Sequence, residues 1–118
     1  MNMKESLKEL MKLDGALVVA LVDSVSGMLL ASEGHGINIE IAAACNTEVV
    51  RAKLKTMKNL RLNDSIEDIL ISLREQYHII RPLEKKQELF IYVVLDRERA
   101  NLALARRQIM DIEKEFKF

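Results

Sequence analysis

Two apolar stretches on either side of a short turn constrain the fold of this chain more than any other feature. Residues 16–22 are apolar without interruption, and a second, mostly apolar stretch follows at Met28–Ser32. A strand that is apolar at every position is buried on both faces, so residues 16–22 are predicted to lie inside a sheet. Turn-forming residues separate the two stretches: Asp23, Ser24, Ser26 and Gly27. The segment is therefore predicted to be a buried β-hairpin.

Helical periodicity indicates three helices elsewhere in the chain. A short amphipathic helix opens the chain, with its apolar stripe at Met3, Leu7, Leu10 and Met11. A long helix is predicted over residues 39–59, and Asn38 is a suitable N-cap for it. The helical period returns from Arg97, with an apolar stripe of Leu102, Ala105, Ile109, Ile112 and Phe116.

The middle helix carries two apolar faces where an ordinary surface helix has one. The bulkier face is predicted to pack on the sheet and consists of Ile39, Ala43, Val50, Leu54 and Met57. The other face, richer in small residues, consists of Ile41, Ala42, Cys45, Val49 and Ala52. The opposite side of the helix is predicted to face solvent and consists of Glu40, Thr47, Glu48, Arg51, Lys55 and Lys58. Because so small a chain has little left to cover the second face, we expect a second copy to cover it.

Three more strands are predicted after this helix, at Ser65–Leu73, Tyr77–Leu83 and Leu89–Leu95. The last is apolar throughout and is therefore also predicted to be central. The element order is then αββαβββα. Two central strands with apolar faces require helices on both sides of one sheet. The predicted fold class is α/β, a three-layer α/β/α sandwich with one antiparallel five-stranded sheet, as a single domain over residues 1–118.

Composition narrows the classes of function. The chain has 18 basic and 18 acidic residues, so no net field attracts nucleic acid or anionic lipid. A single cysteine cannot form an intramolecular disulfide, which indicates a reducing compartment. The first residues lack a signal-peptide core, and residues 16–22 are too few to span a bilayer. We expect a cytoplasmic protein that neither binds nucleic acid nor inserts into membranes.

Residues with reactive chemistry are few. Cys45 with His35 or His78 could form a nucleophile and its base, but Cys45 lies among alanines and is interpreted as a buried packing residue. Two histidines and one cysteine are too scattered for a zinc site. Gly34-His35-Gly36 precedes the middle helix, but neither a GxGxxG nor a P-loop pattern is present, and a plain loop is favoured. No catalytic, cofactor-binding or metal-binding residue is therefore predicted.

Basic residues gather in the second half of the middle helix. They are Arg51, Lys53, Lys55, Lys58 and Arg61. The favoured interpretation is a solvated face that complements the negative helix terminus. The alternative is a docking patch for an acidic partner surface, made by Arg51, Lys55, Lys58 and Arg61.

The alternation of Ile69, Ile71 and Leu73 leaves two interpretations open. These residues could form an edge strand that pairs with its counterpart in a dimer. An ordinary strand covered by its own helix is about equally consistent with the pattern. In the first interpretation, Ile69 and Ile71 join the second face of the middle helix in a dimer interface.

The order of these segments resembles the bacterial type of the Roadblock/dynein light chain family over essentially the whole chain. The parts that carry the resemblance are Gly15–Val19, Gly27–Ser32, the alanine-bearing middle helix, Ile79–Leu83 and Asn101–Arg106. It implies a fold similar to profilin and longin, and homo- or heterodimers formed through the middle helix and the neighbouring sheet edge. It also implies binding to Ras-like small GTPases.

The resemblance therefore implies a non-catalytic homodimeric regulator or scaffold that binds a small Ras-like GTPase and modulates its nucleotide cycle. The alternative is a structural dimeric adaptor for protein assembly with no effect on a GTPase. An enzyme is disfavoured because no paired carboxylates, metal ligands or nucleophile arrangement stands out.

Overall fold

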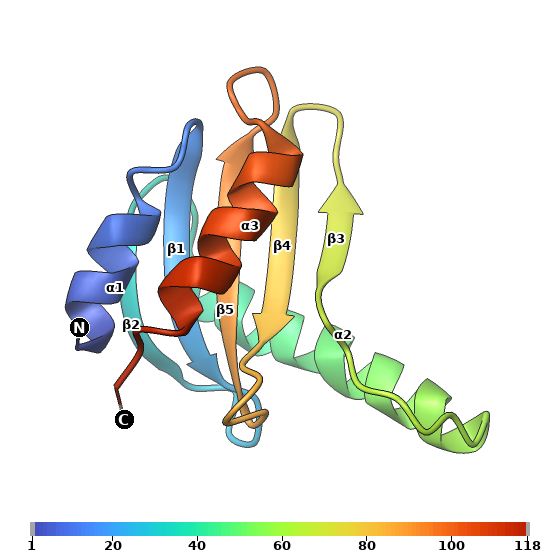
Figure 1. Ribbon diagram of the computed structural model, residues 1–118. Coiled ribbons are helices and arrows are strands. Elements are labelled where there is room, and N and C mark those ends of the chain that lie inside the picture. Colours follow the sequence, from blue (N-terminus) through green and yellow to red (C-terminus); the bar gives the residue numbers. More distant parts are fainter. Residues whose placement is uncertain (1, 118) are drawn as a thin grey trace.

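A computed structural model describes residues 2–117 of the chain. Its elements run in the predicted order αββαβββα (Figure 1). They are α1 (Met3–Leu10), β1 (Ala16–Asp23), β2 (Leu29–Gly34), α2 (Ile39–Asn59), β3 (Ile69–Ser72), β4 (Gln76–Pro82), β5 (Leu89–Asp96) and α3 (Leu102–Glu113).

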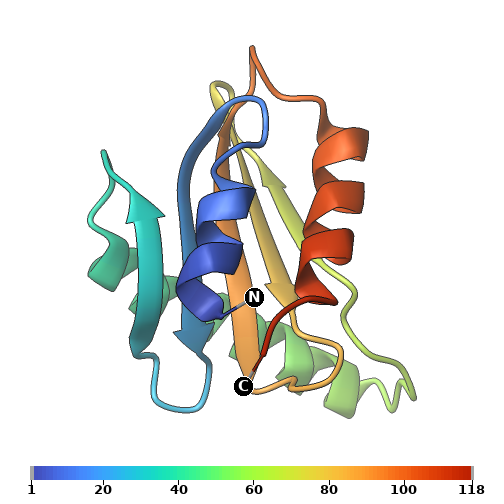
Figure 2. The same cartoon turned by 60° about the vertical axis from the view of Figure 1, so that its left-hand side comes forward.

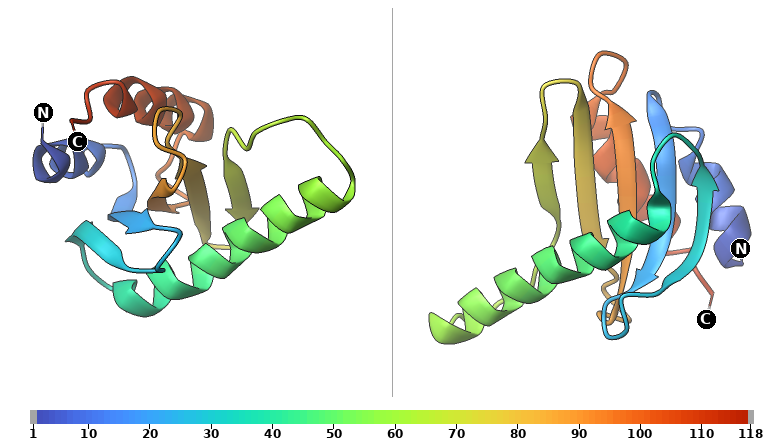
Figure 3. Two further views of the ribbon diagram at one scale, coloured as in Figure 1. Left: turned by 90° about the horizontal axis from the view of Figure 1, so that it is seen from below. Right: turned by 180° about the vertical axis from the view of Figure 1, so that it is seen from behind.

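The five strands form one antiparallel sheet in the order β2-β1-β5-β4-β3. Helices α1 and α3 cover one face of this sheet and α2 crosses the other, as Figure 2 and the left panel of Figure 3 show. The predicted three-layer α/β/α sandwich is therefore confirmed. β2 and β3 are the two edge strands.

The uninterrupted apolar strands occupy the middle of the sheet, as their patterns predict. β5 is the central strand, and every residue in Leu89–Leu95 is buried. Its residues alternate between two cores. Ile91, Val93 and Leu95 contribute to the core beneath α1 and α3. Phe90, Tyr92 and Val94 contribute to the core beneath α2.

β2, predicted to end at Ser32 in a buried hairpin, continues to Gly34 and is only partly buried because it is an edge strand. Two other boundaries differ by four residues or more from the sequence prediction. The strand predicted from Ser65 begins only at Ile69, because the preceding segment is held by contacts with α3 and β4. There the guanidinium of Arg106 forms two hydrogen bonds of 3.0 Å with the Asp68 carboxylate. The last helix begins at Leu102 and not at Arg97, because Asn101 caps it by accepting a hydrogen bond from the backbone N–H of Leu104.

A nearly buried ion pair fixes the end of α3 against the sheet. The Nε of Arg81 on β4 donates to Oε1 of Glu113 at 2.5 Å, and both side chains are about nine-tenths buried. The other carboxylate oxygen of Glu113 accepts a hydrogen bond from the backbone N–H of Glu84. This carboxylate therefore links α3 to β4 and to the turn that follows it.

Candidate protein-interaction surface

Helix α2 is longer than the sheet is wide, and one end of it projects past the sheet. Its 21 residues extend over about 31 Å, whereas the edge strands of a five-stranded sheet lie about 19 Å apart. The N-terminal half lies over β1 and β2, and the C-terminal half passes β3 and overhangs it (right panel of Figure 3). Asn38 caps the helix, since its side-chain oxygen accepts from the backbone N–H of Ile41 at 3.2 Å.

Only part of the predicted sheet-packing face of α2 is buried. Ala43, Val50 and Met57 are buried, and Ile39 is partly buried against the same core. Leu54 belongs to this face but is 48% exposed, although Met57 further along the helix is buried.

The second apolar face of α2 is only partly uncovered in a single chain. Ile41 is 60% exposed, and Cys45 and Ala52 are also exposed. Ala42 and Val49 are partly buried because they pack against the core beneath the helix. The interpretation of Cys45 as a buried packing residue is wrong for the isolated chain, because this cysteine lies on the uncovered side of the helix.

The edge strand β3 is next to the overhanging half of α2. Its Ile69 and Ile71 side chains are partly buried on the α2 side of the sheet, and Leu73 beyond the strand is 44% exposed. One long side of β3 has no neighbouring strand among residues 2–117. β3 is therefore an edge strand, and because Ile69 also packs in the core beneath α2, both interpretations of Ile69, Ile71 and Leu73 remain open.

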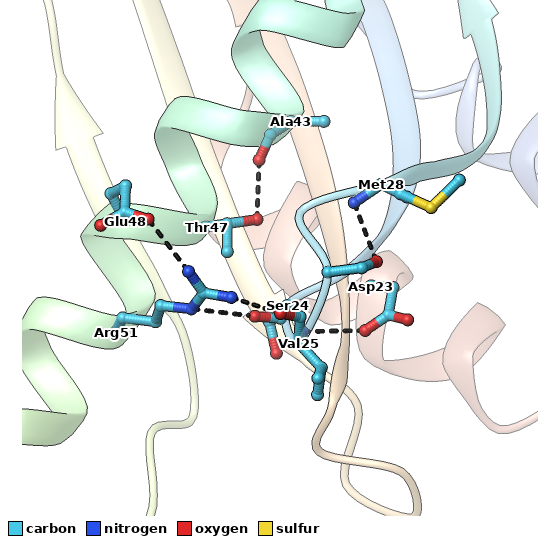
Figure 4. A network of polar contacts seen from close by, with 9 residues as sticks. Asp23, Ser24, Val25, Met28, Ala43, Thr47, Glu48 and Arg51 are labelled. Carbon is cyan, nitrogen blue, oxygen red and sulfur yellow. Dashed lines mark hydrogen bonds and ion pairs between the residues drawn. The ribbon is translucent and has the colours of Figure 1, made fainter.

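Arg51 connects α2 to the β1–β2 turn, a contact that the sequence did not indicate (Figure 4). Its Nε donates to the carbonyl of Ser24 at 3.2 Å, its Nη2 donates to the carbonyl of Val25, and its Nη1 pairs with Glu48 at 3.1 Å. The guanidinium therefore fastens the β1–β2 turn to α2. The charge of Arg51 is less available to a partner than those of Lys55, Lys58 and Arg61.

Thr47 was predicted on the solvent-facing side of α2, but it is only 1% exposed. The β1–β2 turn lies against this side of the helix, and a Cβ placed on Gly27 would lie 3.9 Å from the Thr47 hydroxyl. That hydroxyl is satisfied within the helix, since it donates to the carbonyl of Ala43 at 2.8 Å (Figure 4). The prediction failed because a helical wheel contains no information about the turn that packs on it.

The basic residues lie on the overhanging half of α2. Lys53, Lys55, Lys58 and Arg61 are all exposed. Arg61 adopts a left-handed conformation (φ 57°) just after the helix. The backbone N–H groups of Arg61 and Leu62 donate to the carbonyls of Lys58 and Met57, which makes a Schellman ending with arginine at the position that glycine usually takes.

A chain of polar side chains crosses the α2 side of the sheet, and sequence reasoning missed it. The Nε2 of His78 lies 2.8 Å from Oε1 of Gln76, and its Nδ1 lies 2.8 Å from the hydroxyl of Tyr92. Because an amide oxygen only accepts, Nε2 carries the proton and Nδ1 accepts from the tyrosine. Asn46 on α2 hydrogen-bonds to Tyr92 and so joins the helix to this chain.

Burial determines the protonation of this polar chain. It lowers the pKa of the His78 imidazole from its ordinary value of 6.5, so the neutral form is favoured. It raises the pKa of the Tyr92 phenol, an effect that the hydrogen bond with Asn46 partly offsets. Gln76 and His78 alternate with Tyr77 and Ile79 in β4, and this polar period of two is the sequence signal that could have revealed them.

Cys45, His35 and His78 are the residues that were weighed for reactive chemistry and set aside. Within residues 2–117, no group of three or more histidine, cysteine, aspartate or glutamate side chains is arranged to hold a metal ion. His35 is exposed in the loop before α2, and both ring nitrogens of His78 are occupied by Gln76 and Tyr92. Within the same range, no helix has the length and apolarity needed to cross a membrane.

Solved structures with the same arrangement of helices and strands identify the fold. Myxococcus xanthus MglB superposes with a TM-score of 0.83 at 21% identity, covering 95% of this chain and 89% of that one. A Roadblock/LC7 domain from Streptomyces avermitilis also gives 0.83, at 10% identity, covering 98% and 94%. The chain has the Roadblock fold.

A third Roadblock-fold relative is the gliding protein MglB of Thermus thermophilus. Its TM-score is 0.72 at 17% identity, and the match covers 94% of this chain and 87% of that one. No protein-family model and no curated protein sequence matches this chain. The likeness therefore lies in the three-dimensional arrangement, and it agrees with the fold that the sequence pattern predicts.

Proposed function

We propose that this protein is a non-catalytic, homodimeric regulator or scaffold that binds a small Ras-like GTPase and modulates its nucleotide cycle. Residues 1–118 would act as a single domain in the cytoplasm, without a cofactor of their own. The observation that carries the proposal is the uncovered side of the molecule. There the C-terminal half of α2 overhangs β3, whose outer edge is unpaired, and Ala52 of the second apolar face is exposed.

A two-fold axis perpendicular to the sheet and beside β3 would satisfy both surfaces at once. Two β3 strands would pair antiparallel across the axis, which joins the two sheets into one. The same rotation brings the two α2 helices together on one side of that joined sheet. Small residues at Ala42, Cys45 and Ala52 would then permit close helix approach.

Binding to a small GTPase is supported by the resemblance of the sequence to the Roadblock/dynein light chain family and by the likeness of the fold to MglB. The chemistry available for docking is the exposed basic patch at the end of α2. Lys55, Lys58 and Arg61 extend from it freely enough to meet an acidic surface, whereas Arg51 is already bound to the β1–β2 turn.

A non-catalytic role is supported by the absence of a free base for the one cysteine among the residues that the structure describes. A cysteine nucleophile requires a neighbouring base and a low thiol pKa. His78 is held neutral, and both of its ring nitrogens are engaged within the sheet. Any effect on a nucleotide cycle would therefore come from contact with the partner.

The test is capture of partners by the purified, immobilised protein in two nucleotide states. Lysate of its own cells is supplied once with a non-hydrolysable GTP analogue and once with GDP, and the retained proteins are identified by mass spectrometry. A small GTPase retained in one state only is the expected result. A Lys55→Ala/Lys58→Ala variant reports whether the basic patch is used.

Two outcomes contradict the proposal. Either no GTPase is retained, or the same proteins are retained under both nucleotides. The second outcome favours the structural adaptor, which uses the dimer to hold proteins together and is indifferent to the nucleotide.

A further inference from the structure

The end of α2 and the residues directly after it form a projection in which exposed apolar and basic side chains are mixed. This tip consists of residues 53–62 and extends past β3 at the edge of the sheet (right panel of Figure 3). Leu60 is 62% exposed and Leu62 is 52% exposed, on either side of the exposed Arg61. Met57 in the last turn of the helix is buried. The tip is therefore packed on one side and presents two large apolar side chains to solvent.

The charge of the tip is entirely positive. Residues 49–63 contain no aspartate or glutamate, and Glu48 just before them pairs with Arg51. The zero net charge of the whole chain does not cancel the charge of the tip, because charges further apart than about 8–10 Å are largely screened at physiological salt. Four exposed basic side chains remain there without an ion pair to any of residues 2–117: Lys53, Lys55, Lys58 and Arg61.

These basic residues surround the tip and do not share one face. Lys53 and Lys55 are two positions apart, so they point to different sides of the helix, and Arg61 lies beyond its end. A protein surface that met one side of α2 would reach only some of them. A wide anionic surface that received the tip end-on would lie within reach of all four.

The backbone of Arg61 supports a role for this side chain in binding. Arg61 has a φ of 57° at the position after a helix where glycine usually stands. The left-handed conformation is unfavourable for a residue with a Cβ atom. Glycine would relieve this strain, but it would remove the charge from the front of the tip.

We propose that the tip docks on the surface of an anionic phospholipid bilayer. Leu60 and Leu62 enter the boundary between headgroups and acyl chains, and the four basic residues contact the lipid phosphates around them. Nucleic acid is another extended anionic surface, but it offers no apolar phase to the leucines. Residues 53–62 also contain no aromatic side chain on which a base could stack.

The inference goes beyond the proposed function, because it assigns the tip to a membrane surface and not to a GTPase. The contact is peripheral and requires no membrane-spanning helix. Each basic residue near an anionic bilayer strengthens binding by roughly fivefold. Since salt screens this attraction, binding is expected to weaken as the NaCl concentration rises.

Cosedimentation of the purified protein with lipid vesicles tests the charges of the tip. We expect binding to vesicles of equal parts phosphatidylcholine and phosphatidylglycerol, and none to vesicles of phosphatidylcholine alone. Lys55→Glu/Lys58→Glu should weaken binding by at least about 25-fold, since two contacts are lost and two repulsions are added. Lys4→Glu/Lys8→Glu makes the same change of charge on α1 and should weaken binding by less than about threefold.

The same assay tests the leucines. Leu60→Ser/Leu62→Ser should weaken binding to the anionic vesicles by roughly tenfold, because the apolar surface that enters the bilayer is lost. Val25→Ser/Met28→Ser, at exposed apolar positions of the β1–β2 turn, is the matched control and should bind like the unmodified protein. Circular dichroism checks that each variant is folded.

No binding to the anionic vesicles, or binding that either tip variant retains in full, overturns the inference. The vesicle assay contains only the protein and lipid, so a failure to capture a GTPase leaves its result unaffected. If the vesicles are not bound and Lys55→Ala/Lys58→Ala loses a captured GTPase, the tip serves a protein partner and the inference is likewise overturned.

Discussion

At the scale of single residues, Arg51 shows how one side chain can fix the position of a helix. Its guanidinium binds the carbonyls of Ser24 and Val25 and pairs with Glu48. The turn it holds also covers Thr47, and it reaches Glu88 through the Ser24 hydroxyl at 2.8 Å. One basic residue thus connects α2, the β1–β2 turn and the loop before β5.

Replacement of Arg51 should therefore loosen this end of the molecule. Arg51→Ala is expected to lower the free energy of unfolding by about 1 kcal/mol, since hydrogen bonds to two carbonyls are lost. Urea denaturation measures the change. Lys55→Ala, an exposed basic residue one turn further along α2, is the matched control and should change stability by less than about 0.5 kcal/mol. Equal effects would mean that the guanidinium contacts contribute nothing.

His78 gives the protein a defined response to pH. Burial lowers its folded-state pKa below the ordinary 6.5, so the unfolded chain binds the proton more readily. The contribution of His78 to the free energy of unfolding is therefore fully present above pH 6.5. It decreases as the pH falls from there towards the folded-state pKa. In a His35→Gln background the decrease belongs to His78. Urea denaturation between pH 8 and pH 5.5 measures it, and stability that increases on acidification would contradict this assignment.

At the scale of elements, α3 is held by the ion pair between Arg81 and Glu113. Both side chains are about nine-tenths buried, so neither charge has water to replace a lost partner. Glu113→Ala is expected to cost about 3 kcal/mol, because it leaves the Arg81 charge buried and unpaired. Asp111→Ala, at an exposed position of the same helix, should cost far less.

A double variant separates pairing from packing at this site. Arg81→Met/Glu113→Leu removes both charges and fills their space, so it should be more stable than Glu113→Ala. A double variant less stable than the single one would show that the ion pair itself is strongly stabilising.

The second apolar face of α2 is the element on which self-association depends. Ala52 is exposed at the C-terminal end of this face, so Ala52→Glu would place a carboxylate where two helices are proposed to meet. We expect monomers that retain the folded circular dichroism spectrum. Ala103→Glu introduces the same charge at an exposed position of α3 and should remain dimeric. A fully dimeric Ala52→Glu variant would exclude this face from the interface.

At the scale of the whole molecule, the sequence was sufficient for the architecture. Residues 16–22 and Leu89–Leu95 are apolar at every position, and this alone places two strands inside a sheet with helices on both sides. The two-faced pattern of the middle helix likewise places Ala43, Val50 and Met57 in the core and leaves Ile41, Cys45 and Ala52 exposed. These properties depend on local periodicity, which the sequence contains directly.

Properties that depend on contacts between distant segments could not be predicted in the same way. The burial of Thr47 requires the β1–β2 turn to fold back on α2. The late start of β3 at Ile69 follows from the contact of Asp68 with Arg106 on α3. The bond between His78 and Tyr92 requires the register of β4 against β5, which periodicity does not determine.

Self-association of two copies of this chain through the α2 face and the β3 edge is the property on which the proposed function depends most. Sedimentation equilibrium of the unmodified protein at micromolar concentration and low salt tests it most directly. We expect a species with twice the 13.5 kDa mass of the chain. A single species of 13.5 kDa that persists as the protein concentration increases would contradict self-association through these surfaces.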